Sequence, residues 1–498
     1  MEIGTIISLA LYFIVMLGIG LYAFKTTEQD SSGYLLGGRQ LGPAVTALSA
    51  GASDMSGWMV MGLPGAMYLT GLSSAWIAIG LTVGAYINYI IVAPRLRMYT
   101  ELASDSITLP EFFENRFEDK TRLLRIISSV VIIVFFTVYT SSGVVGGGKL
   151  FESSFGLSYE LGLYVTAGVV VTYTLFGGFL AVSMTDFVQG CIMFVALIMV
   201  PVVVLYEFGS YSDIQQAIAE VDPSRMDWVA GTSALGIISA LAWGFGYFGQ
   251  PHIIVRFMAI RSVKDIKVAR RIGMGWMVLA LVGAILTGFF GIAYVSKNEI
   301  PLADAETIFI VLSQVLFHPL IGGFLLAAIL AAIMSTVSSQ LLVTSSSLTE
   351  DFYKAFLKKD ASEKELVLIG RICVAAVALI AIFLAHNRDS SILQLVSNAW
   401  AGFGAAFGPL IVLGLYWKRM TFAGALAGIV VGASTVLIWI YAPLSIDGQS
   451  LSSYIYEIVP GVLFSTAAIV GVSFLTKEPS PEIQSLFDTM VQRVKSES

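Results

Sequence analysis

An aspartate lies in the middle of a long apolar segment that is rich in helix-breaking residues. The segment covers residues 41–69; Asp54 stands among glycines and serines, and Pro64 follows. A carboxylate at mid-bilayer depth costs roughly 2.5–3.5 kcal/mol on insertion scales, so it usually marks the path of an ion or substrate. Breaks beside it would free backbone amides and carbonyls, which is tolerated at that depth only around a cavity or ligand. The segment therefore predicts a transporter with an interrupted membrane helix.

The composition is that of a chain that crosses a membrane many times. The 498 residues are 56% hydrophobic and only 12% charged. Soluble domains carry about 25% charged residues, so this chain has too few charges to cover a surface that faces water. The net charge of −6 gives no electrostatic basis for binding nucleic acid. The two cysteines, Cys191 and Cys373, lie in or beside apolar stretches, which excludes a disulfide framework.

Thirteen apolar stretches are long enough to cross the hydrocarbon core. They lie at 3–23, 41–69, 72–93, 123–148, 160–181, 186–207, 231–251, 272–295, 319–346, 366–385, 391–416, 420–441 and 455–476. An odd number places the two termini on opposite sides of the membrane. With the N-terminus outside, only Lys149, Arg225, Lys297 and Arg388 of the 28 basic residues are on the outer side. Because basic residues accumulate on the inner side, an outer N-terminus and a cytoplasmic C-terminus are predicted.

Two of these stretches are interrupted, and they stand five stretches apart. The second breaks near Gly51 to Gly57, and the seventh carries three glycines and a proline between Ala242 and Pro251. Stretches 2–6 and 7–11 can therefore be read as two five-helix repeats, each beginning with a broken helix. Since five is odd, the repeats have opposite orientations in the membrane, which points to a binding site at mid-depth.

The predicted fold is thus an all-α polytopic membrane protein with thirteen transmembrane helices and two inverted repeats. An N-terminal helix with its inner loop occupies residues 1–40, and the repeats occupy 41–207 and 231–416. Two further helices follow at 417–476. The polar segment 477–498 is predicted to be a loosely attached cytoplasmic tail. Two inner loops have capping-box spacing, at Thr108–Glu111 and Ser262–Asp265, which predicts short surface helices.

Hydroxyl groups on the ninth stretch face the first break in the predicted arrangement. Sodium prefers several oxygen ligands, and unwound backbone at Ala52 and Met55 offers carbonyl oxygens. Ser335 and Thr336 lie near the middle of the ninth stretch and offer hydroxyls. Taken alone, such hydroxyls more often bond to carbonyls of their own or a neighbouring helix. Opposite a broken helix that carries Asp54, we interpret them as sodium ligands.

Aromatic residues accompany both breaks. Trp58 lies beside the first break, Trp243 and Tyr247 lie one helical turn apart in the second, and Tyr139 is at mid-depth in the fourth stretch. Such rings either pack against lipid and neighbouring helices or enclose a ligand. A small apolar ring between them, with its carboxylate at the N-terminus of a half-helix, would suit the site.

The sequence lacks the usual constellations of an enzyme. The three histidines, His252, His318 and His386, have no spacing typical of a zinc site. There is no pair of carboxylates at mid-depth, no nucleophile with a neighbouring base and no phosphate-binding loop. The sequence therefore predicts that the protein is not an enzyme.

Five stretches of the chain resemble the sodium/solute symporter family. They are Gly37–Trp58, Gly177–Gln189, Trp243–His252, Met334–Leu342 and Trp400–Pro409. The likeness runs over nearly the whole chain; the second stretch matches a signature of the whole family, and the others favour its proline-transporting branch. The resemblance implies import of L-proline with co-transported sodium by alternating access, in a bacterial cytoplasmic membrane and without an obligate protein partner.

The resemblance also implies roles for individual residues. Positions that match sodium ligands are Ala52, Met55, Ala332, Ser335 and Thr336. Positions that match substrate contacts are Trp58, Gly62, Tyr139, Trp243, Tyr247 and Pro251. Positions tied to coupling are Asp54, Ser56, Arg39 and Asp186, of which Arg39 and Asp186 lie near the inner ends of their stretches. Gln40 stands where the family usually has a serine, and Asn398 where it usually has an aromatic residue.

Three other functions stay open at this point. The same fold could carry another small carboxylate, such as pantothenate, or another amino acid. An ion channel would need a continuous pore, and the aromatic residues beside the breaks argue against one. An intramembrane enzyme is disfavoured because a catalytic pair is missing.

Overall fold

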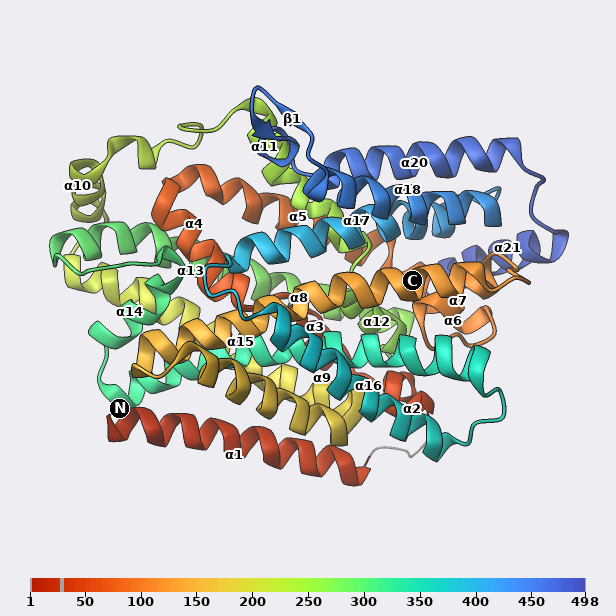
Figure 1. Cartoon of the computed structure of the whole chain (residues 1–498), viewed down its shortest axis with the longest axis horizontal. Helices are drawn as coiled ribbons and strands as arrows, with labels where there is room; N and C mark the ends of the chain where they lie inside the picture. The colour runs from red at the N-terminus through yellow and green to blue at the C-terminus, as the bar shows by residue number, and fades with distance from the viewer. Residues whose placement is uncertain (1, 27–30, 498) are drawn as a thin grey trace.

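The computed structural model describes residues 2–26 and 31–497, and the chain there is almost entirely helical (Figure 1). Among these residues, ten helices are long and apolar enough to cross a membrane. The prediction of an all-α polytopic membrane protein is confirmed. The count of thirteen stays a prediction, because the stretches at 41–69, 160–181 and 231–251 are each interrupted. Parts of the predicted N-terminal segment and tail, at residues 1, 27–30 and 498, lie outside the described residues.

The helices follow one another along the chain as follows. They are α1 (Ile3–Thr26), α2 (Ser31–Leu36), α3 (Pro43–Asp54), α4 (Leu63–Thr70), α5 (Ala75–Ile91), α6 (Ala93–Leu102), α7 (Leu109–Arg116), α8 (Leu123–Phe155), α9 (Tyr159–Phe208), α10 (Tyr211–Val221), α11 (Ala234–Leu241), α12 (Pro251–Ala259), α13 (Ile266–Lys297), α14 (Ile308–Val315), α15 (Pro319–Ser346), α16 (Glu363–Leu384), α17 (Ile392–Tyr416), α18 (Phe422–Tyr441), α19 (Leu451–Tyr454), α20 (Ile458–Leu475) and α21 (Pro481–Glu497). A small hairpin of β1 (Ser445–Ile446) and β2 (Gln449–Ser450) precedes α19.

The first predicted break is present. Helix α3 ends at Asp54, residues 55 and 56 are unwound, and the chain continues as a wide helical turn, η2 (Trp58–Gly62), before α4. Glycine in α3 also permits close packing, since a Cβ added at Gly51 would lie 2.8 Å from the ring of Trp276 on α13. The break is therefore placed where helices α3 and α13 approach each other closely.

The second break is also present, but the helix after it is longer than predicted. A 3₁₀ segment, η5 (Ala242–Phe248), follows α11, and α12 starts at Pro251 after an unwound Gly249–Gln250. Proline suits the first position of a helix, so Pro251 begins a half-helix rather than ending the stretch. All of α12 is buried, although residues after 251 were assigned to an inner loop.

The fifth and sixth predicted stretches are joined in one helical run. Helix α9 continues through residues 182–185, where a loop was expected, and it kinks instead at Gly178 with φ 57° and ψ −157°. Only glycine adopts that conformation readily. The expectation was wrong because residues after Gly178 stay apolar, so composition gave no sign of where the chain bends.

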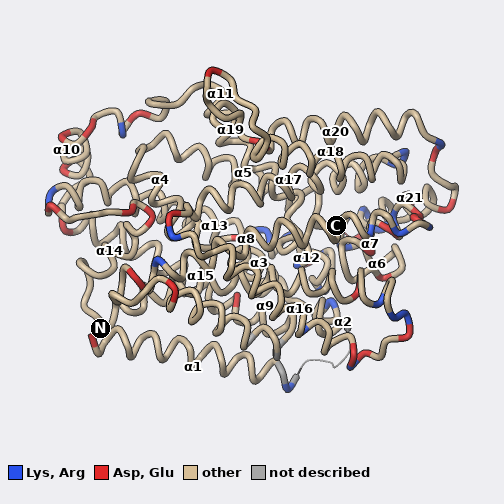
Figure 2. The backbone as a smooth tube through the Cα atoms, in the orientation of Figure 1, with Lys and Arg blue, Asp and Glu red and all other residues tan. Residues whose placement is uncertain are grey.

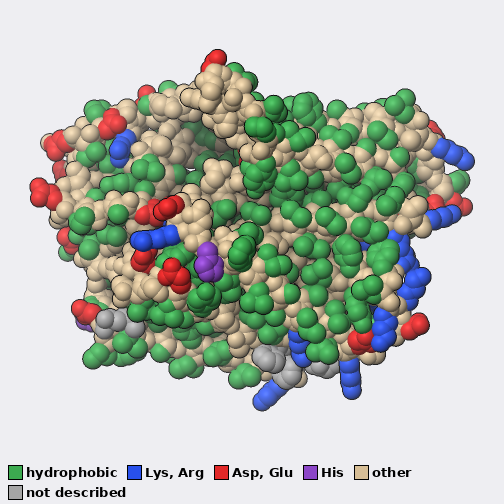
Figure 3. All heavy atoms as spheres, in the orientation of Figure 1, with side chains coloured by type: hydrophobic (Ala, Val, Ile, Leu, Met, Phe, Trp, Pro, Cys, Tyr) green, Lys and Arg blue, Asp and Glu red, His purple; other side chains and the backbone are tan. Residues whose placement is uncertain are grey.

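The outer layer of helices presents apolar side chains to the surroundings. Helix α1 packs against α9 and α15, and α18 packs against α17 and α20. Figure 3 shows apolar side chains spread over the flank, with charged groups mainly towards the two ends. Phe383 and Leu475 are 76% and 88% exposed, as expected of residues that contact lipid.

The C-terminal segment is not a loose tail. Helix α21 packs against α6, with Phe487 and Met490 buried on its apolar face. The predicted surface helix after Thr108 is present as α7, and the Thr108 side chain accepts a hydrogen bond from the backbone of Glu111 at 3.1 Å. Ser262 caps a short helical turn in the same way. The prediction of a loosely attached tail was wrong, because it relied on the polar composition of the segment and overlooked the apolar face of an amphipathic helix.

Candidate ion and substrate site

Four of the five predicted sodium ligands lie in one hydrogen-bonded cluster between α3 and α15. The Ser335 hydroxyl donates to the carbonyl of Ala52 at 2.7 Å and to that of Ala332 at 3.2 Å. The Thr336 hydroxyl donates to the same Ala52 carbonyl at 3.4 Å. Met55, the fifth, is the buried residue that directly follows the end of α3. Carbonyl and hydroxyl oxygens thus converge at the first break, which is the ligand type that sodium prefers.

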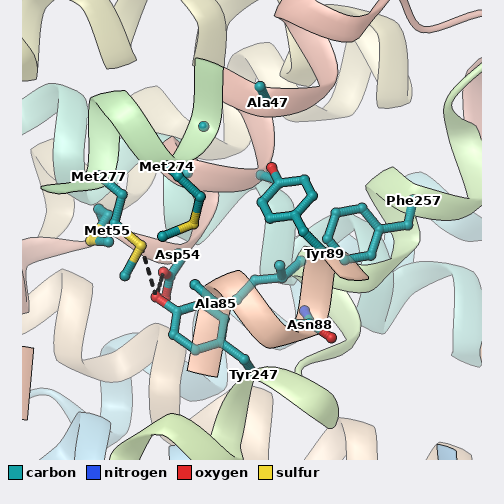
Figure 4. Close-up of a pocket in the computed structure, with 14 residues that line it drawn as sticks. Ala47, Asp54, Met55, Ala85, Asn88, Tyr89, Tyr247, Phe257, Met274 and Met277 are labelled. Carbon is teal, nitrogen blue, oxygen red and sulfur yellow. Dashed lines mark hydrogen bonds between the residues drawn. The ribbon is translucent and has the colours of Figure 1, made fainter. Parts of the chain in front are cut away.

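Asp54 connects the two broken helices. The Tyr247 hydroxyl of η5 donates to one carboxylate oxygen of Asp54, as Figure 4 shows. The backbone carbonyl of Asp54 accepts bonds from Trp58 Nε1 at 3.0 Å and from the Tyr139 hydroxyl at 3.5 Å. The other carboxylate oxygen, Oδ1, has no hydrogen-bond partner among the described residues. Asp54 is therefore anchored to the aromatic residues while half of its charged group stays available.

A small cavity of about 30 Å³ lies beside this carboxylate (Figure 4). Its walls include Asn88, Tyr89, Met274 and Met277, and the buried Asn88 Oδ1 also lacks a partner among the described residues. This volume is enough for one water molecule or one ion. Sequence reasoning missed Asn88, although an amide inside the apolar stretch 72–93 is a signal of the same kind as Asp54.

Aromatic rings pack against one another between the two breaks. The Trp243 ring lies 6.4 Å from that of Trp58 and stacks on Tyr456 at 5.4 Å with an interplanar angle of 26°. Trp400 meets Tyr247 edge to face at 5.1 Å, and its indole N–H donates to the Trp243 carbonyl at 2.7 Å. Trp58, Tyr139, Trp243 and Tyr247 are thus brought together, whereas Trp400 and Tyr456 were not among the predicted site residues.

A larger cavity, which we name the vestibule, ends at this aromatic group. It has a volume of about 770 Å³, and its walls come from α11, α17 and the segment between α18 and α20. The residues that line it include Trp243, Gln394, Asn398, Ser453, Tyr456 and Glu457. The vestibule gives a solute of amino-acid size a route to Trp243 and Tyr456.

Gly62 and Pro251 lie at the margins of this arrangement. A Cβ added at Gly62 would lie 3.2 Å from Leu393 Cβ at the start of α17. Pro251 lines a separate cavity of about 20 Å³ together with residues of α7 and α15. The next residue, His252, is buried and meets the Tyr139 ring edge to face at 5.7 Å. His252 is therefore the residue by which this part of the chain contacts the aromatic group.

Arg39 joins three segments of the chain close to the start of α3. Its guanidinium donates to the carbonyls of Met258 and Ser106, both at 2.7 Å, and pairs with Asp105 at 2.9 Å. Beside it, Leu41 exchanges backbone hydrogen bonds with the chain that follows α12. The start of α3 and the end of α12 are thereby held together, so this end of the site is closed.

Asp186 belongs to a buried ionic network that the sequence did not reveal. Arg256 of α12 pairs with Asp186 at 3.1 Å, and both side chains are at most 1% exposed. Ser49 donates to Asp186 at 2.7 Å, and Arg256 donates to Ser339 at 2.6 Å. The sequence places Asp186 at the first residue of the stretch 186–207, whereas the second half of α9 begins eight residues earlier, at Gly178.

Ser56 supports the restart of the chain after the first break. Its hydroxyl accepts a bond from the backbone N–H of Trp58 at 3.3 Å, and its carbonyl accepts one from Met59 at 3.0 Å. Its own N–H donates to the Asp54 carbonyl at 2.9 Å. Ser56 therefore satisfies backbone groups that the break leaves free.

Interrupted helices, an oxygen cluster at the first break and aromatic rings between the two breaks are the features of one class of protein, the ion-coupled membrane transporters. The model of the family described as "Sodium:solute symporter family" matches residues 34–432. The chain belongs to the sodium:solute symporter family, as the resemblance predicted. Members of this family are transporters, so the prediction that the protein is not an enzyme is confirmed.

Several bacterial relatives align over almost their whole length. The chain is 58% identical to the osmoregulated proline transporter OpuE of Bacillus subtilis, over 99% of each chain. It is 60% identical to the high-affinity proline transporter PutP of the same organism, over 96% of this chain and 100% of the relative. It is 56% identical to sodium/proline symporter 2 of Staphylococcus saprophyticus, over 99% and 96% of the two chains.

Solved structures share the fold at much lower sequence identity. A Na⁺-coupled sialic acid symporter in a substrate-bound outward-open state superposes with a TM-score of 0.81 at 19% identity, covering 96% of this chain and 99% of that one. The nucleobase-cation-symport-1 transporter Mhp1 in a closed conformation gives a TM-score of 0.55 at 12% identity, over 92% and 98%. These likenesses establish the transporter fold.

Proposed function

We propose that the chain imports L-proline together with sodium by alternating access. The observation that carries this proposal is the oxygen cluster of Ala52, Ser335 and Thr336. Ala52 stands two residues before Asp54 in the chain, and Asp54 in turn bonds to the aromatic residues. The names of three relatives at 56–60% identity, all proline transporters or symporters, support proline as the cargo.

Sodium would bind where α3 ends. Its ligands would be the carbonyls of Ala52, Met55 and Ala332 and the hydroxyls of Ser335 and Thr336. The two hydroxyls now donate to Ala52, and rotation of their protons would turn lone pairs towards the ion. Since these ligands come from α3 and α15, sodium would fix the broken helix against α15 and so order Asp54 and Trp58.

L-Proline would occupy the space between the two breaks. Its ring would lie among Trp58, Tyr139, Trp243 and Tyr247, because flat apolar rings bind a small apolar ring well. Its carboxylate would meet the N-terminus of a half-helix, with Gly62 and Pro251 at the two candidate positions. The sodium site and this pocket share Asp54, which provides the route for coupling.

Release to the inside would require the closed end to open. The bonds of Arg39 to Met258, Ser106 and Asp105 join the segments that must separate. We assign Arg39 and Asp186, with Asp54 and Ser56, to coupling. One sodium ion moving down about 100 mV supplies about 2.3 kcal/mol, enough for roughly fifty-fold accumulation of a neutral solute.

The orientation and the division of the chain belong to the same proposal. Figure 2 shows Lys and Arg gathered at the end where α6, α7 and α21 lie, which favours that end as cytoplasmic. The N-terminus would then be outside and the C-terminus inside a bacterial cytoplasmic membrane. Residues 41–207 and 231–416 would form the two inverted repeats, flanked by 1–40, 417–476 and 477–498.

Uptake of labelled L-proline by purified protein in liposomes tests this function. We expect saturable uptake that is stimulated by an inward sodium gradient and by an inside-negative potential. Strong competition by pantothenate or another amino acid would identify a different cargo on the same fold. Flux that does not saturate would indicate a channel.

The Thr336→Val variant tests the sodium site. Valine keeps the shape and removes one hydroxyl, so we expect the half-saturating sodium concentration to rise about tenfold while uptake at saturating sodium persists. The matched control is Thr344→Val, because Thr344 bonds only a carbonyl of its own helix, at 2.7 Å. An unchanged sodium dependence of Thr336→Val would remove α15 from the ion site.

The Trp243→Ala variant tests the aromatic pocket. Loss of the ring between Trp58 and Tyr456 should raise the KM for proline about tenfold, with a smaller change in sodium dependence. The control is Trp228→Ala, which removes an indole that pairs with Trp76 at 5.7 Å away from the breaks. A normal KM in Trp243→Ala would contradict a substrate site at this position.

A further inference from the structure

A carboxylate with one unpartnered oxygen lines the vestibule, and its remaining interactions are with Ser452 and its own backbone. Glu457 immediately precedes α20, is 1% exposed, and has no partner for its Oε1 atom among the described residues. Its side chain also makes no capping bond to α20. Buried polar atoms are nearly always paired, so an unpaired charged oxygen on a cavity wall indicates a ligand of opposite charge.

The vestibule carries a single formal charge. Glu457 is the only Asp, Glu, Lys, Arg or His among the described residues that line it, and the others are serines, amides, apolar residues and aromatic rings. Because Glu457 is almost completely buried, a bound cation would compensate the charge of its carboxylate. The cavity is therefore suited to a positively charged group.

The carboxylate is next to the aromatic wall that leads to the candidate pocket. Tyr456 precedes Glu457 in the chain and stacks on Trp243 at 5.4 Å. Its position is held at two points, because its hydroxyl donates to the Ser397 carbonyl at 2.6 Å and its N–H donates to Ser239 at 2.9 Å. The charged oxygen and the stacked rings thus form one continuous wall of the vestibule.

We propose that Glu457 binds the ammonium group of the incoming amino acid in the vestibule, before the solute reaches Trp243. This inference rests on the proposed transport of L-proline. The proline ring would contact Tyr456, and its carboxylate would face the amides of Gln394 and Asn398. An ammonium group fits better than sodium, because its N–H donors suit one unpaired oxygen, whereas sodium needs several oxygen ligands at once.

The Glu457→Gln variant in liposomes tests this site, because glutamine keeps the size and removes the charge. We expect the KM for proline to rise about fivefold, with the maximal rate and the half-saturating sodium concentration unchanged. Pyrrolidine, which has the ammonium group without the carboxylate, should inhibit Glu457→Gln about fivefold less well than wild type. Cyclopentanecarboxylate, which lacks the ammonium group, should inhibit both proteins equally. Glu220→Gln is the control, since Glu220 is an exposed carboxylate on α10 outside the vestibule.

Two results would overturn the proposal. The first is that Glu457→Gln has the same KM for proline and the same inhibition by pyrrolidine as wild type. The second is that Glu457→Gln needs a higher sodium concentration, which would mean that the charge of Glu457 attracts sodium and not the amino acid. Should Glu457→Gln fail to reach the membrane, Ser453→Lys places a positive charge on the same wall at an exposed residue. It should raise the KM, and a normal KM there would also reject the site. Wild-type protein without sodium-dependent proline uptake would instead refute the proposed function.

Discussion

The Asp54→Asn variant is expected to lose most of its response to sodium, with a rise of about 100-fold in the half-saturating sodium concentration. The carboxylate is 2% exposed and makes one side-chain hydrogen bond, to Tyr247, and none of the ion pairs between described residues involves it. A buried charge needs compensation, and a sodium ion bound at the carbonyl of Ala52, two residues before Asp54 in the chain, would provide it. Asparagine keeps the hydrogen-bond acceptor and removes the charge. Uptake of labelled proline at a series of sodium concentrations measures the effect.

The Tyr247→Phe variant is the control for Asp54→Asn. It removes the hydroxyl that bonds to Asp54 but leaves the carboxylate, so the sodium requirement should change little while the KM for proline rises. If Asp54→Asn kept the normal sodium requirement, the charge of Asp54 would not belong to the ion site. If both variants changed sodium and proline dependence equally, Asp54 would act by holding Tyr247 in place.

Residues that interrupt helices made much of the site predictable. Glycines and a proline crowd both breaks, and their effect on the backbone is local, so the breaks could be placed to within a few residues. The cluster of Ala52, Ser335 and Thr336 could be predicted for a related reason. Once one helix is broken around a carboxylate, hydroxyls at the same depth on another helix are the nearest uncharged oxygen ligands.

The missed residues depend on packing between distant helices. Trp400 on α17 and Tyr456 before α20 both contact Trp243. No local sequence pattern predicts contacts between residues so far apart in the chain. Arg256 was predicted to lie in an inner loop, because a charged residue after Pro251 normally indicates the end of a membrane stretch. Only the continuation of α12 to Ala259 shows that this guanidinium is buried.

The Arg256→Met variant is expected to be strongly destabilised. Methionine fills a similar volume but leaves Asp186 without its cation in the interior, which costs about 3–5 kcal/mol when one partner of a buried pair is removed. The thermal unfolding midpoint of the purified protein measures the loss. Lys418→Met is the matched control, because its pair with Asp488 is 39% and 52% exposed and such pairs contribute less than about 1 kcal/mol.

The double variant Arg256→Met with Asp186→Leu separates the ion pair from the rest of the network. Two apolar residues in place of a buried pair are often as stable as the pair itself, so the unfolding midpoint should recover most of its loss. Sodium-coupled uptake of proline, in contrast, should not recover in the double variant. Ser339, which accepts from Arg256, donates to the Ser335 carbonyl at 2.8 Å, so the pair also positions the backbone of the proposed sodium site. Arg256 also donates to the hydroxyl of Ser49 at 3.0 Å. A double variant that stays as unstable as Arg256→Met would show that Arg256 stabilises the fold through its bonds to Ser49 and Ser339 rather than through Asp186.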